Sequence, residues 1–255
     1  MTAALLATGA PLVIGHRGAA ARAPENTLPS FEHAVAAGAD ALELDVHLSA
    51  DGRVVVIHDP ALDRTTDRSG AVASLTLAQI QAADAGARFT TDGRTFPFRG
   101  QGIRVPVIEE VLARFPSTPL LIELKTAAAS AELRRLIAAH RAEDRCVIGS
   151  FDGASLAPFR APPWHVTASQ AEVQRLLAHV LLGAPAGAER YEVLSIPPSW
   201  HRIPLPLRAI ARHAKRRGVP VHIWTVDRPA EAVSLWERGV TGIISNDPAA
   251  IIAAR

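Results

Sequence analysis

Strand-like and helix-like patterns alternate along nearly the whole chain, and this alternation limits the possible folds more than any other feature. Short runs rich in Val, Ile and Leu are separated by stretches with apolar residues at helical spacing, such as Leu28, Phe31 and Val35. Eight such pairs predict a parallel sheet covered by helices. The predicted strands are Pro11–His16, Ala41–His47, Leu120–Lys125, Cys146–Ser150, His165–Ala168, Glu192–Ile196, Val221–Val226 and Gly242–Ser245.

The length of 255 residues suits one closed barrel of parallel strands. We therefore predict an α/β fold, a (β/α)8 or TIM barrel, with residues 1–255 forming a single domain. The rival is an open, doubly wound sheet. No Gly-x-Gly-x-x-Gly motif follows the first predicted strand, which favours the barrel.

One segment, from about residue 47 to residue 106, breaks the alternation. It begins with the turn signal Asp51-Gly52, so the strand that follows runs antiparallel to the second predicted strand and cannot join a parallel barrel. We predict a small insertion after the second strand. If Asp51 and Gly52 are the two central residues of the turn, Asp45 lies opposite His58 on one face of this hairpin.

Three acidic residues stand at the ends of neighbouring predicted strands. Glu43 and Asp45 are two residues apart, so a strand places both on one face, and Glu123 ends the next strand. Carboxylates at positions that usually hold Val or Ile cost stability unless a cation lies between them. Hard oxygen ligands suit Mg²⁺ or Ca²⁺, so we predict one divalent cation bound by all three residues. Solvated acids, or acids paired with arginine, are the alternative.

Basic side chains accompany these acids. His16 and His58 are candidates for a general acid and base, because imidazole titrates near neutral pH; a structural hydrogen-bonding role is the alternative. Arg17 and Lys125 are predicted to contact a phosphate group. With a divalent cation and three carboxylates, they leave the site one positive charge in excess, which a phosphodiester would neutralise. Pairing of these two residues with the acids alone is the alternative.

Three further residues have candidate roles. Glu25 is predicted to orient Arg17 or to support the metal, and Asn26 is a reasonable N-cap for the first helix. Trp224 is predicted to line the substrate pocket as an apolar wall for the leaving group, with plain barrel packing as the alternative. We interpret the eight histidines other than His16 and His58 as surface or interface residues.

The composition restricts the class of protein. The formal net charge of +2 gives no strong signal for nucleic-acid binding, and the single cysteine, Cys146, excludes an intramolecular disulfide. The residues before the first strand contain no Lys or Arg, and no apolar run reaches membrane-spanning length. We therefore expect a cytoplasmic protein without a signal peptide or stable membrane insertion, of undetermined oligomeric state.

The combined motifs resemble those of glycerophosphodiester phosphodiesterases over nearly the whole chain. The residues that carry the resemblance are His16-Arg17-Gly18, Pro24-Glu25-Asn26-Thr27, Glu43-Leu44-Asp45-Val46, Asp51-Gly52, His58-Asp59, Arg64-Thr65-Thr66, Glu123-Leu124-Lys125 and Trp224-Thr225-Val226. The chain departs from the usual family pattern at Ser245-Asn246, where the family often has Thr-Asp, and at Asp227, where Asn is usual. It also departs at Val105-Pro106-Val107-Ile108, where Ile-Pro-Thr-Leu is commoner.

The resemblance implies a catalytic barrel with an insertion after strand two, a divalent metal on the three acids, and an acid–base pair of histidines. The implied reaction is metal-dependent hydrolysis of a glycerophosphodiester to glycerol 3-phosphate and an alcohol. One alternative is a phosphodiesterase of the lysophospholipase D or C type, which needs an apolar rim; the sequence offers only Trp200, Trp224 and Pro-rich loops for it. The other alternative is a phosphodiester-binding protein without turnover, although no proposed catalytic group is missing. The head group, the choice of ion, the roles of the two histidines and the attacking oxygen stay open.

Overall fold

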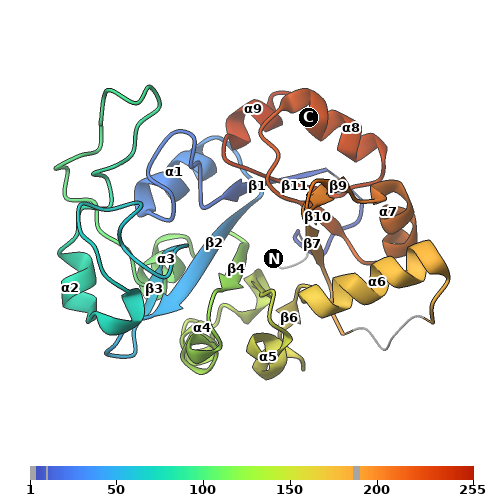
Figure 1. Ribbon diagram of the computed structural model, residues 1–255, viewed down its shortest axis with the longest axis horizontal. Coiled ribbons are helices and arrows are strands. Elements are labelled where there is room, and N and C mark those ends of the chain that lie inside the picture. Colours follow the sequence, from blue (N-terminus) through green and yellow to red (C-terminus); the bar gives the residue numbers. More distant parts are fainter. Residues whose placement is uncertain (1–3, 10, 186–189) are drawn as a thin grey trace.

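In the computed structural model, which describes residues 4–9, 11–185 and 190–255, the predicted strands lie side by side in one parallel sheet (Figure 1). In chain order, these strands are β1 (Leu12–His16), β2 (Ala41–Leu48), β4 (Leu120–Leu124), β5 (Cys146–Gly149), β6 (His165–Val166), β7 (Leu194–Ile196), β10 (Val221–Ile223) and β11 (Gly242–Ser245).

The sheet closes on itself. Its order is β6-β5-β4-β2-β1-β11-β10-β7, so the first strand of the chain lies between the second and the last. The edge strands β6 and β7 also meet, because the N–H of Ala168 donates to the carbonyl of Val193 at 2.9 Å and Thr167 forms a parallel bridge with Val193. The predicted (β/α)8 barrel is confirmed.

Alternation along the strands places the acids inside the barrel. Leu42, Leu44 and Val46 of β2 belong to the large core cluster beneath the helices. The residues between them, Glu43 and Asp45, therefore point to the interior. An acidic pair inside a barrel is the local feature that the sequence pattern predicts.

Helices follow the strands around the outside. They are α1 (Leu28–Ala36), α3 (Ile108–Arg114), α4 (Ser130–Ala139), α5 (Gly153–Leu156), α6 (Gln170–Leu182), α7 (Leu207–Arg216), α8 (Pro229–Glu237) and α9 (Pro248–Ile252). The sequence predicts a helix over Gly153–Arg160, but α5 ends at Leu156 because the chain continues as a 3₁₀ helix, Ala157–Phe159.

The segment between β2 and α3 forms the insertion at the left of Figure 1. It contains β3 (Val54–Val56), which is antiparallel to β2, the 3₁₀ helix Val72–Ser74 and α2 (Leu77–Gln81). This segment has an apolar cluster of its own, which includes the fully buried Val55, Val72 and Ile80. That the whole chain is one catalytic domain with an insertion over about residues 47–106 stays a prediction.

The predicted register of this hairpin is wrong by one residue. Val46 pairs with Val56, and the N–H of Ile57 donates to the carbonyl of Asp45 at 3.0 Å, so Ile57 and not His58 lies opposite Asp45. The reason is the loop, which has three residues between Ser49 and Arg53 and ends with Gly52 at φ 75°. A loop of this length shifts the pairing relative to a two-residue turn.

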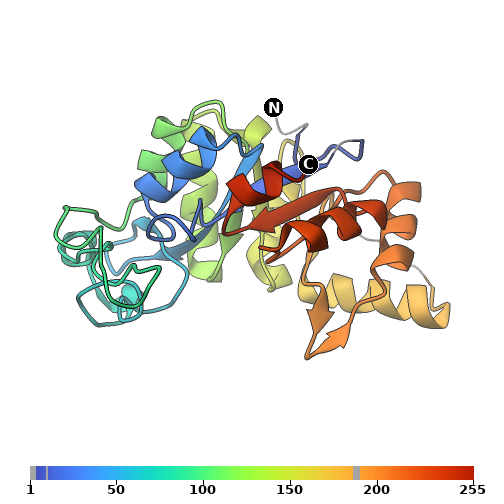
Figure 2. The same ribbon diagram turned by 90° about the horizontal axis from the view of Figure 1, so that it is seen from above.

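A second hairpin follows β7. It consists of β8 (Ser199–Trp200) and β9 (Ile203–Pro204), in a stretch that the sequence predicts only as a Pro-rich loop. Figure 2 shows this hairpin and α6 projecting from the same side of the molecule as the insertion segment, at its other end. The two features therefore stand on either side of the barrel mouth, where the barrel strands end.

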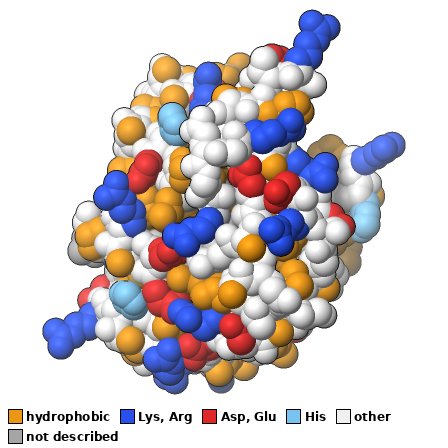
Figure 3. All heavy atoms as spheres, turned by 90° about the vertical axis from the view of Figure 1, so that its left-hand side faces the viewer, with side chains coloured by type: hydrophobic (Ala, Val, Ile, Leu, Met, Phe, Trp, Pro, Cys, Tyr) orange, Lys and Arg blue, Asp and Glu red, His pale blue; other side chains and the backbone are white. Residues whose placement is uncertain are grey.

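The surface and the helices add two observations. Figure 3 shows Lys and Arg side chains interspersed with Asp and Glu side chains on the face that carries the insertion. Among the described residues, no helix has both the length and the apolar composition that a membrane span requires. The surface interpretation of the other histidines is wrong for His213 and His222, which are buried.

Candidate active site

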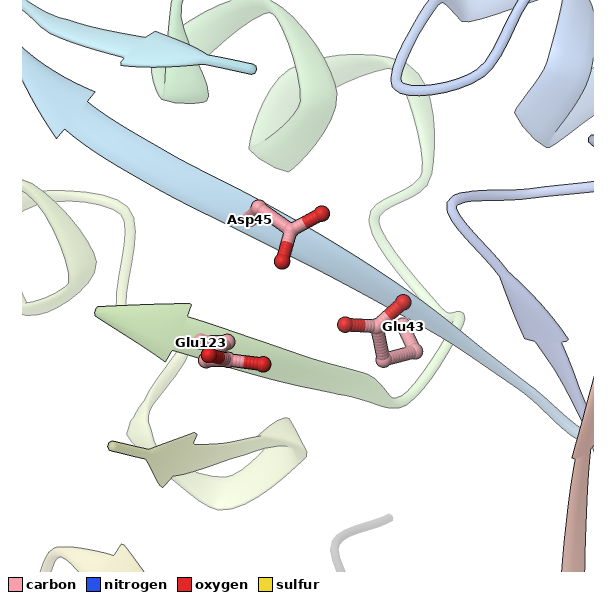
Figure 4. Close-up of side chains that lie close together, drawn as sticks. All are labelled: Glu43, Asp45 and Glu123. Atoms are coloured by element: carbon pink, nitrogen blue, oxygen red, sulfur yellow. The ribbon is translucent and has the colours of Figure 1, made fainter. Parts of the chain in front are cut away.

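The three predicted metal ligands lie together at the barrel mouth. Glu43 and Asp45 on β2 and Glu123 on β4 face a common space, as Figure 4 shows. One carboxylate oxygen from each residue lies within 4.8 Å of the others. The pairing of Asp45 with Glu123 across the parallel strands sets this arrangement. The spacing and the all-oxygen donor set fit a hard divalent cation.

The electrostatics of the cluster also fit a cation. Burial, together with the charges of Asp45 and Glu123, raises the pKa of Glu43 well above its usual range. Burial likewise raises the pKa of Glu123. The contacts of Glu43 are the N–H of Arg17 at 2.9 Å and Nε2 of His16 at 4.0 Å. A dication beside these acids would favour their ionised forms.

Asp45 differs because cations already surround it. Lys125 Nζ lies 3.0 Å from one of its oxygens, and Arg17 Nε lies 3.2 Å from the other. Burial opposes ionisation, but these two cations lower the pKa of Asp45. Lys125 also contacts Glu123 at 2.6 Å. Arg17 and Lys125 thus pair with the acids, as the alternative interpretation states, and they also line the cleft.

Asn26 supports Asp45 and does not cap the first helix, so the N-cap interpretation is wrong. Its Nδ2 donates to Oδ2 of Asp45 at 2.9 Å, and its Oδ1 accepts from the N–H of Asp45 at 3.2 Å. Its backbone has φ 57°, a left-handed conformation that asparagine tolerates, and Thr27 occupies the N-cap position.

His16 is held by a neutral side chain. Its Nδ1 lies 2.7 Å from Oδ1 of Asn246, and Nδ2 of Asn246 donates to Asp227 at 2.8 Å. Asp227 also accepts the backbone N–H of Asn246 at 2.8 Å, so the amide orientation is fixed. Burial and the charge of Arg17 lower the pKa of His16.

His58 is held by a charged side chain. Its Nδ1 lies 2.6 Å from Oδ1 of Asp59. Asp59 in turn accepts from Arg64 at 2.7 and 3.1 Å. Hydrogen bonds from Arg64 and from His58 hold the pKa of Asp59 far below its usual value.

Arg64 connects the residues around Arg17 with those around His58. Besides Asp59, it donates to both oxygens of Glu25 at 2.7 Å, and Glu25 accepts from Arg17 Nη1 at 2.8 Å. Burial opposes ionisation of Glu25, but hydrogen bonds from Arg64 and the charge of Arg17 lower its pKa. A continuous chain of charged contacts thus runs from Arg17 to His58, and Glu25 contacts Arg17 as one of its two predicted roles requires.

These groups border one cleft of about 270 Å³. His16, Arg17, Glu43, His58, Glu123 and Lys125 line one part of it, and Trp224 lines the other. The ring of Trp224 meets that of Phe151 edge to face, with 6.0 Å between the centroids. The described residues therefore bring every predicted site residue to the barrel mouth, with Asp45 and Glu25 in direct contact with lining residues.

Sequence reasoning assigned no role to Asp59, Arg64, Asn246 or Asp227. The first two belong to quoted motifs, and the last two were noted as departures from the family pattern. Two of the contacts join residues far apart along the chain: 230 residues separate His16 from Asn246, and 39 separate Glu25 from Arg64. Only the folded chain brings these two pairs together.

Comparison with known proteins agrees with this geometry. Residues 16–250 match the Glycerophosphoryl diester phosphodiesterase family. The chain belongs to this family. The resemblance seen in the motifs is thus confirmed, and the protein is an enzyme of the phosphodiesterase class.

Individual members are similar over most of their length. A glycerophosphodiester phosphodiesterase of Caldanaerobacter subterraneus subsp. tengcongensis is 34% identical over 94% of this chain and 96% of its own. One of Bacillus subtilis is 32% identical over 96% of this chain and 86% of its own. A solved phosphodiesterase of Oleispira antarctica, in complex with the product sn-glycerol-3-phosphate, superposes with a TM-score of 0.77 at 26% identity, covering 96% of both chains.

Proposed function

We propose that this phosphodiesterase hydrolyses a small-molecule glycerophosphodiester in the cytoplasm, giving glycerol 3-phosphate and an alcohol. The observation that carries this proposal is the meeting of three carboxylates, two histidines and two cationic side chains in one cleft. The product bound to the Oleispira antarctica relative supports the same substrate class.

Glu43, Asp45 and Glu123 would hold one divalent cation, Mg²⁺ or Ca²⁺. A bound ion would supply Lewis-acid stabilisation of negative charge on the phosphate. Arg17 and Lys125 would bind the remaining phosphate oxygens and stabilise the charge that grows on them during the reaction. Glu25 would keep Arg17 directed into the cleft.

The hydrogen-bond partners of the histidines suggest separate roles for them. Asp227 accepts only, so it faces Nδ2 of Asn246 and leaves Oδ1 for His16. An oxygen acceptor requires a proton on Nδ1 of His16, and Nε2 is then free to take a proton from the attacking oxygen, whether of water or of the substrate. The carboxylate of Asp59 contacts Nδ1 of His58 and fixes the direction of its ring, so that Nε2 would supply a proton to the leaving alkoxide.

The test measures release of glycerol 3-phosphate from glycerophosphocholine and related diesters. We expect activity with Mg²⁺ or Ca²⁺, loss of activity with chelator, and recovery when the ion is restored. His16→Ala and His58→Ala should each lower turnover by about 10²–10⁴-fold. His33→Ala, on the exposed face of α1, is the matched control. Near-normal turnover in the His16/His58 double variant would refute the assignment.

A further inference from the structure

His58 stands just beyond the end of the β2–β3 ladder, and the ladder alone would not direct it into the cleft. Val46 pairs with Val56, so a continued antiparallel ladder would place His58 opposite Leu44. Residues opposite one another share a face of the sheet, and Leu44 packs in the core beneath the helices. The ring of His58 instead lines the cleft on the interior side. The chain must therefore leave the ladder at His58.

The backbone contacts show where it leaves. After the pair Val46–Val56, the N–H of Ile57 still donates to the carbonyl of Asp45 at 3.0 Å. Within the part of the chain that the structure describes, no backbone N–H then donates to the carbonyl of His58. A carbonyl without a strand partner needs another donor, because an unpaired backbone group is costly away from water.

The ring of His47 supplies this donor. Its Nε2 lies 3.0 Å from the carbonyl oxygen of His58. A carbonyl only accepts, so Nε2 carries a proton, as it does in both the imidazolium ion and one neutral tautomer. The contact therefore does not depend on the charge of the ring. His47 follows Glu43 and Asp45 on one face of β2, from which these two acids project in Figure 4.

We propose that His47 is a positioning residue for the reaction, which holds the backbone of His58 away from the ladder and so directs its imidazole into the cleft. This inference rests on the proposed function, in which His58 gives a proton to the leaving alkoxide. Asp59 fixes the direction of the ring, and His47 fixes the backbone that carries the ring. His47 is half-buried and is not among the described residues that line the cleft, so it would act through His58 and not on the substrate.

The position of His47 adds a second consequence. The hydrogen bond ties the loop of His58 to the strand that carries Glu43 and Asp45. The proton donor and two of the predicted metal ligands would then share one support. A shift of this loop would move His58 relative to the phosphate without moving Arg17 or the acids.

Two substitutions of nearly equal length and shape test the hydrogen bond. Only the glutamine amide of His47→Gln can donate to the carbonyl of His58, whereas the thioether of His47→Met cannot. With glycerophosphocholine and Mg²⁺ or Ca²⁺, His47→Met should lower kcat about 10- to 100-fold, because a small misplacement of a reacting group is costly. His47→Gln should stay within about threefold of the wild type. His140→Met, at an exposed histidine, is the control and should have little effect.

The leaving group separates positioning from a general loss of folded enzyme. The p-nitrophenyl ester of glycerol 3-phosphate releases p-nitrophenolate, a stable anion that gains little from a proton donor. His58→Ala should therefore lose much more activity with glycerophosphocholine than with this ester. His47→Met should show the same pattern, with a loss at least about fivefold greater for glycerophosphocholine. In a His58→Ala background, His47→Met should cost no more than about twofold, because the residue that it positions is gone.

The outcomes distinguish the inference from the proposed function. Equal losses with both substrates in His47→Met, or wild-type kcat in that variant, overturn the positioning role and leave the proposed function intact. The same holds if His47→Gln is as slow as His47→Met. If His58→Ala itself does not distinguish the two substrates, the proposed role of His58 is overturned and the inference with it.

Discussion

The two sides of the cleft are built from equivalent positions of one barrel, yet they are stabilised in opposite ways. On the side of β1, β2 and β4, inward and rim positions carry acids and cations that pair with one another. On the side of β5 to β10, the same kinds of position carry Phe151, Trp224 and their apolar neighbours. Paired charges gain little net stability when buried, whereas apolar packing gains more.

We propose that this difference separates chemistry from substrate choice. The charged side comes from the first half of the chain and would hold the groups that act on a phosphodiester. The apolar side comes from the second half and would contact the rest of the substrate. Changes on the charged side should therefore alter turnover, and changes on the apolar side should alter preference among substrates.

The largest effect is expected from Glu43→Gln. Loss of this carboxylate should lower turnover about 10³-fold, because it removes a predicted metal ligand. In chelator, the same change should stabilise the fold by about 1 kcal/mol, since it removes the burial of a charge and the repulsion that together raise the pKa of Glu43. Enzyme assays and thermal unfolding, each with and without metal, measure both effects.

The sign of the pH dependence sharpens this test. A raised pKa means that the folded carboxyl group holds its proton more tightly than the unfolded chain does. Without metal, the wild-type protein should therefore lose stability as pH rises from the usual value of 4.5 through the folded pKa, and Glu43→Gln should not. Glu231→Gln, on the surface of α8, is the control. A Glu43→Gln protein that is less stable in chelator contradicts the account.

A smaller loss is expected from Arg64→Ala. The side chain connects Glu25 to Asp59, so its removal should loosen Arg17 and His58 together and lower kcat/KM by about 10- to 100-fold. Arg64→Lys should recover only part, because an ammonium group cannot reproduce two bidentate contacts. Arg68→Ala, an exposed arginine of the same segment, should have little effect. Equal activity of Arg64→Ala and Arg68→Ala would show that Arg64 does not support the site.

The sequence predicts the fold and the acid cluster for one reason. Parallel strands must end at the same rim, so residues at the ends of predicted strands can be placed together without any knowledge of loops. Glu43, Asp45 and Glu123 were found in this way. The enclosing helices follow from their apolar spacing, apart from the early end of α5 and other end positions that differ by a residue or two.

Loops and long-range partners lie beyond such reasoning. The loop that ends at Gly52 has one residue more than a two-residue turn. This shifts the hairpin pairing by one residue, so His58 does not lie opposite Asp45. The partner of His16 comes from the end of the last strand and is reached only because the barrel closes. Asn26 fits a helix cap by residue type, but its backbone conformation and its contacts with Asp45 are set by the folded loop.

An exchange of two side chains tests the partners of His16. Asn246→Asp places a carboxylate against Asp227, 2.8 Å away at the present contact, and repulsion should lower kcat/KM about tenfold. The double variant Asp227→Asn/Asn246→Asp restores a donor opposite the new carboxylate and should recover activity to within about threefold. The carboxylate would then face His16, so the acid limb of the kcat/KM profile should move to higher pH. Failure of the double variant to recover, with the fold intact, contradicts this pairing.

Replacement of His222, a titratable residue inside the barrel, should have the smallest effect on activity. Its effect on stability should still be measurable. His222 is fully buried on β10, and burial lowers its pKa from the usual 6.5 to about 4. Above pH 6.5 it is neutral in both folded and unfolded states. Between pH 6.5 and 4 the unfolded chain takes up a proton and the folded protein does not, so stability falls with pH by about 3 kcal/mol at most.

Unfolding in denaturant between pH 7 and 4 compares the wild-type protein with His222→Asn, whose amide does not titrate. The variant should lose less stability than the wild type over this range, and turnover at neutral pH should be retained. His140→Asn, on an exposed residue, should behave as the wild type does. If His222→Asn is as sensitive to acid as the wild type, acid unfolding is governed by the charged side, where Asp45, Glu25 and Asp59 all have lowered pKa values. In that case, the interior around His222 would tolerate a protonated imidazole, although its packing is expected to exclude one.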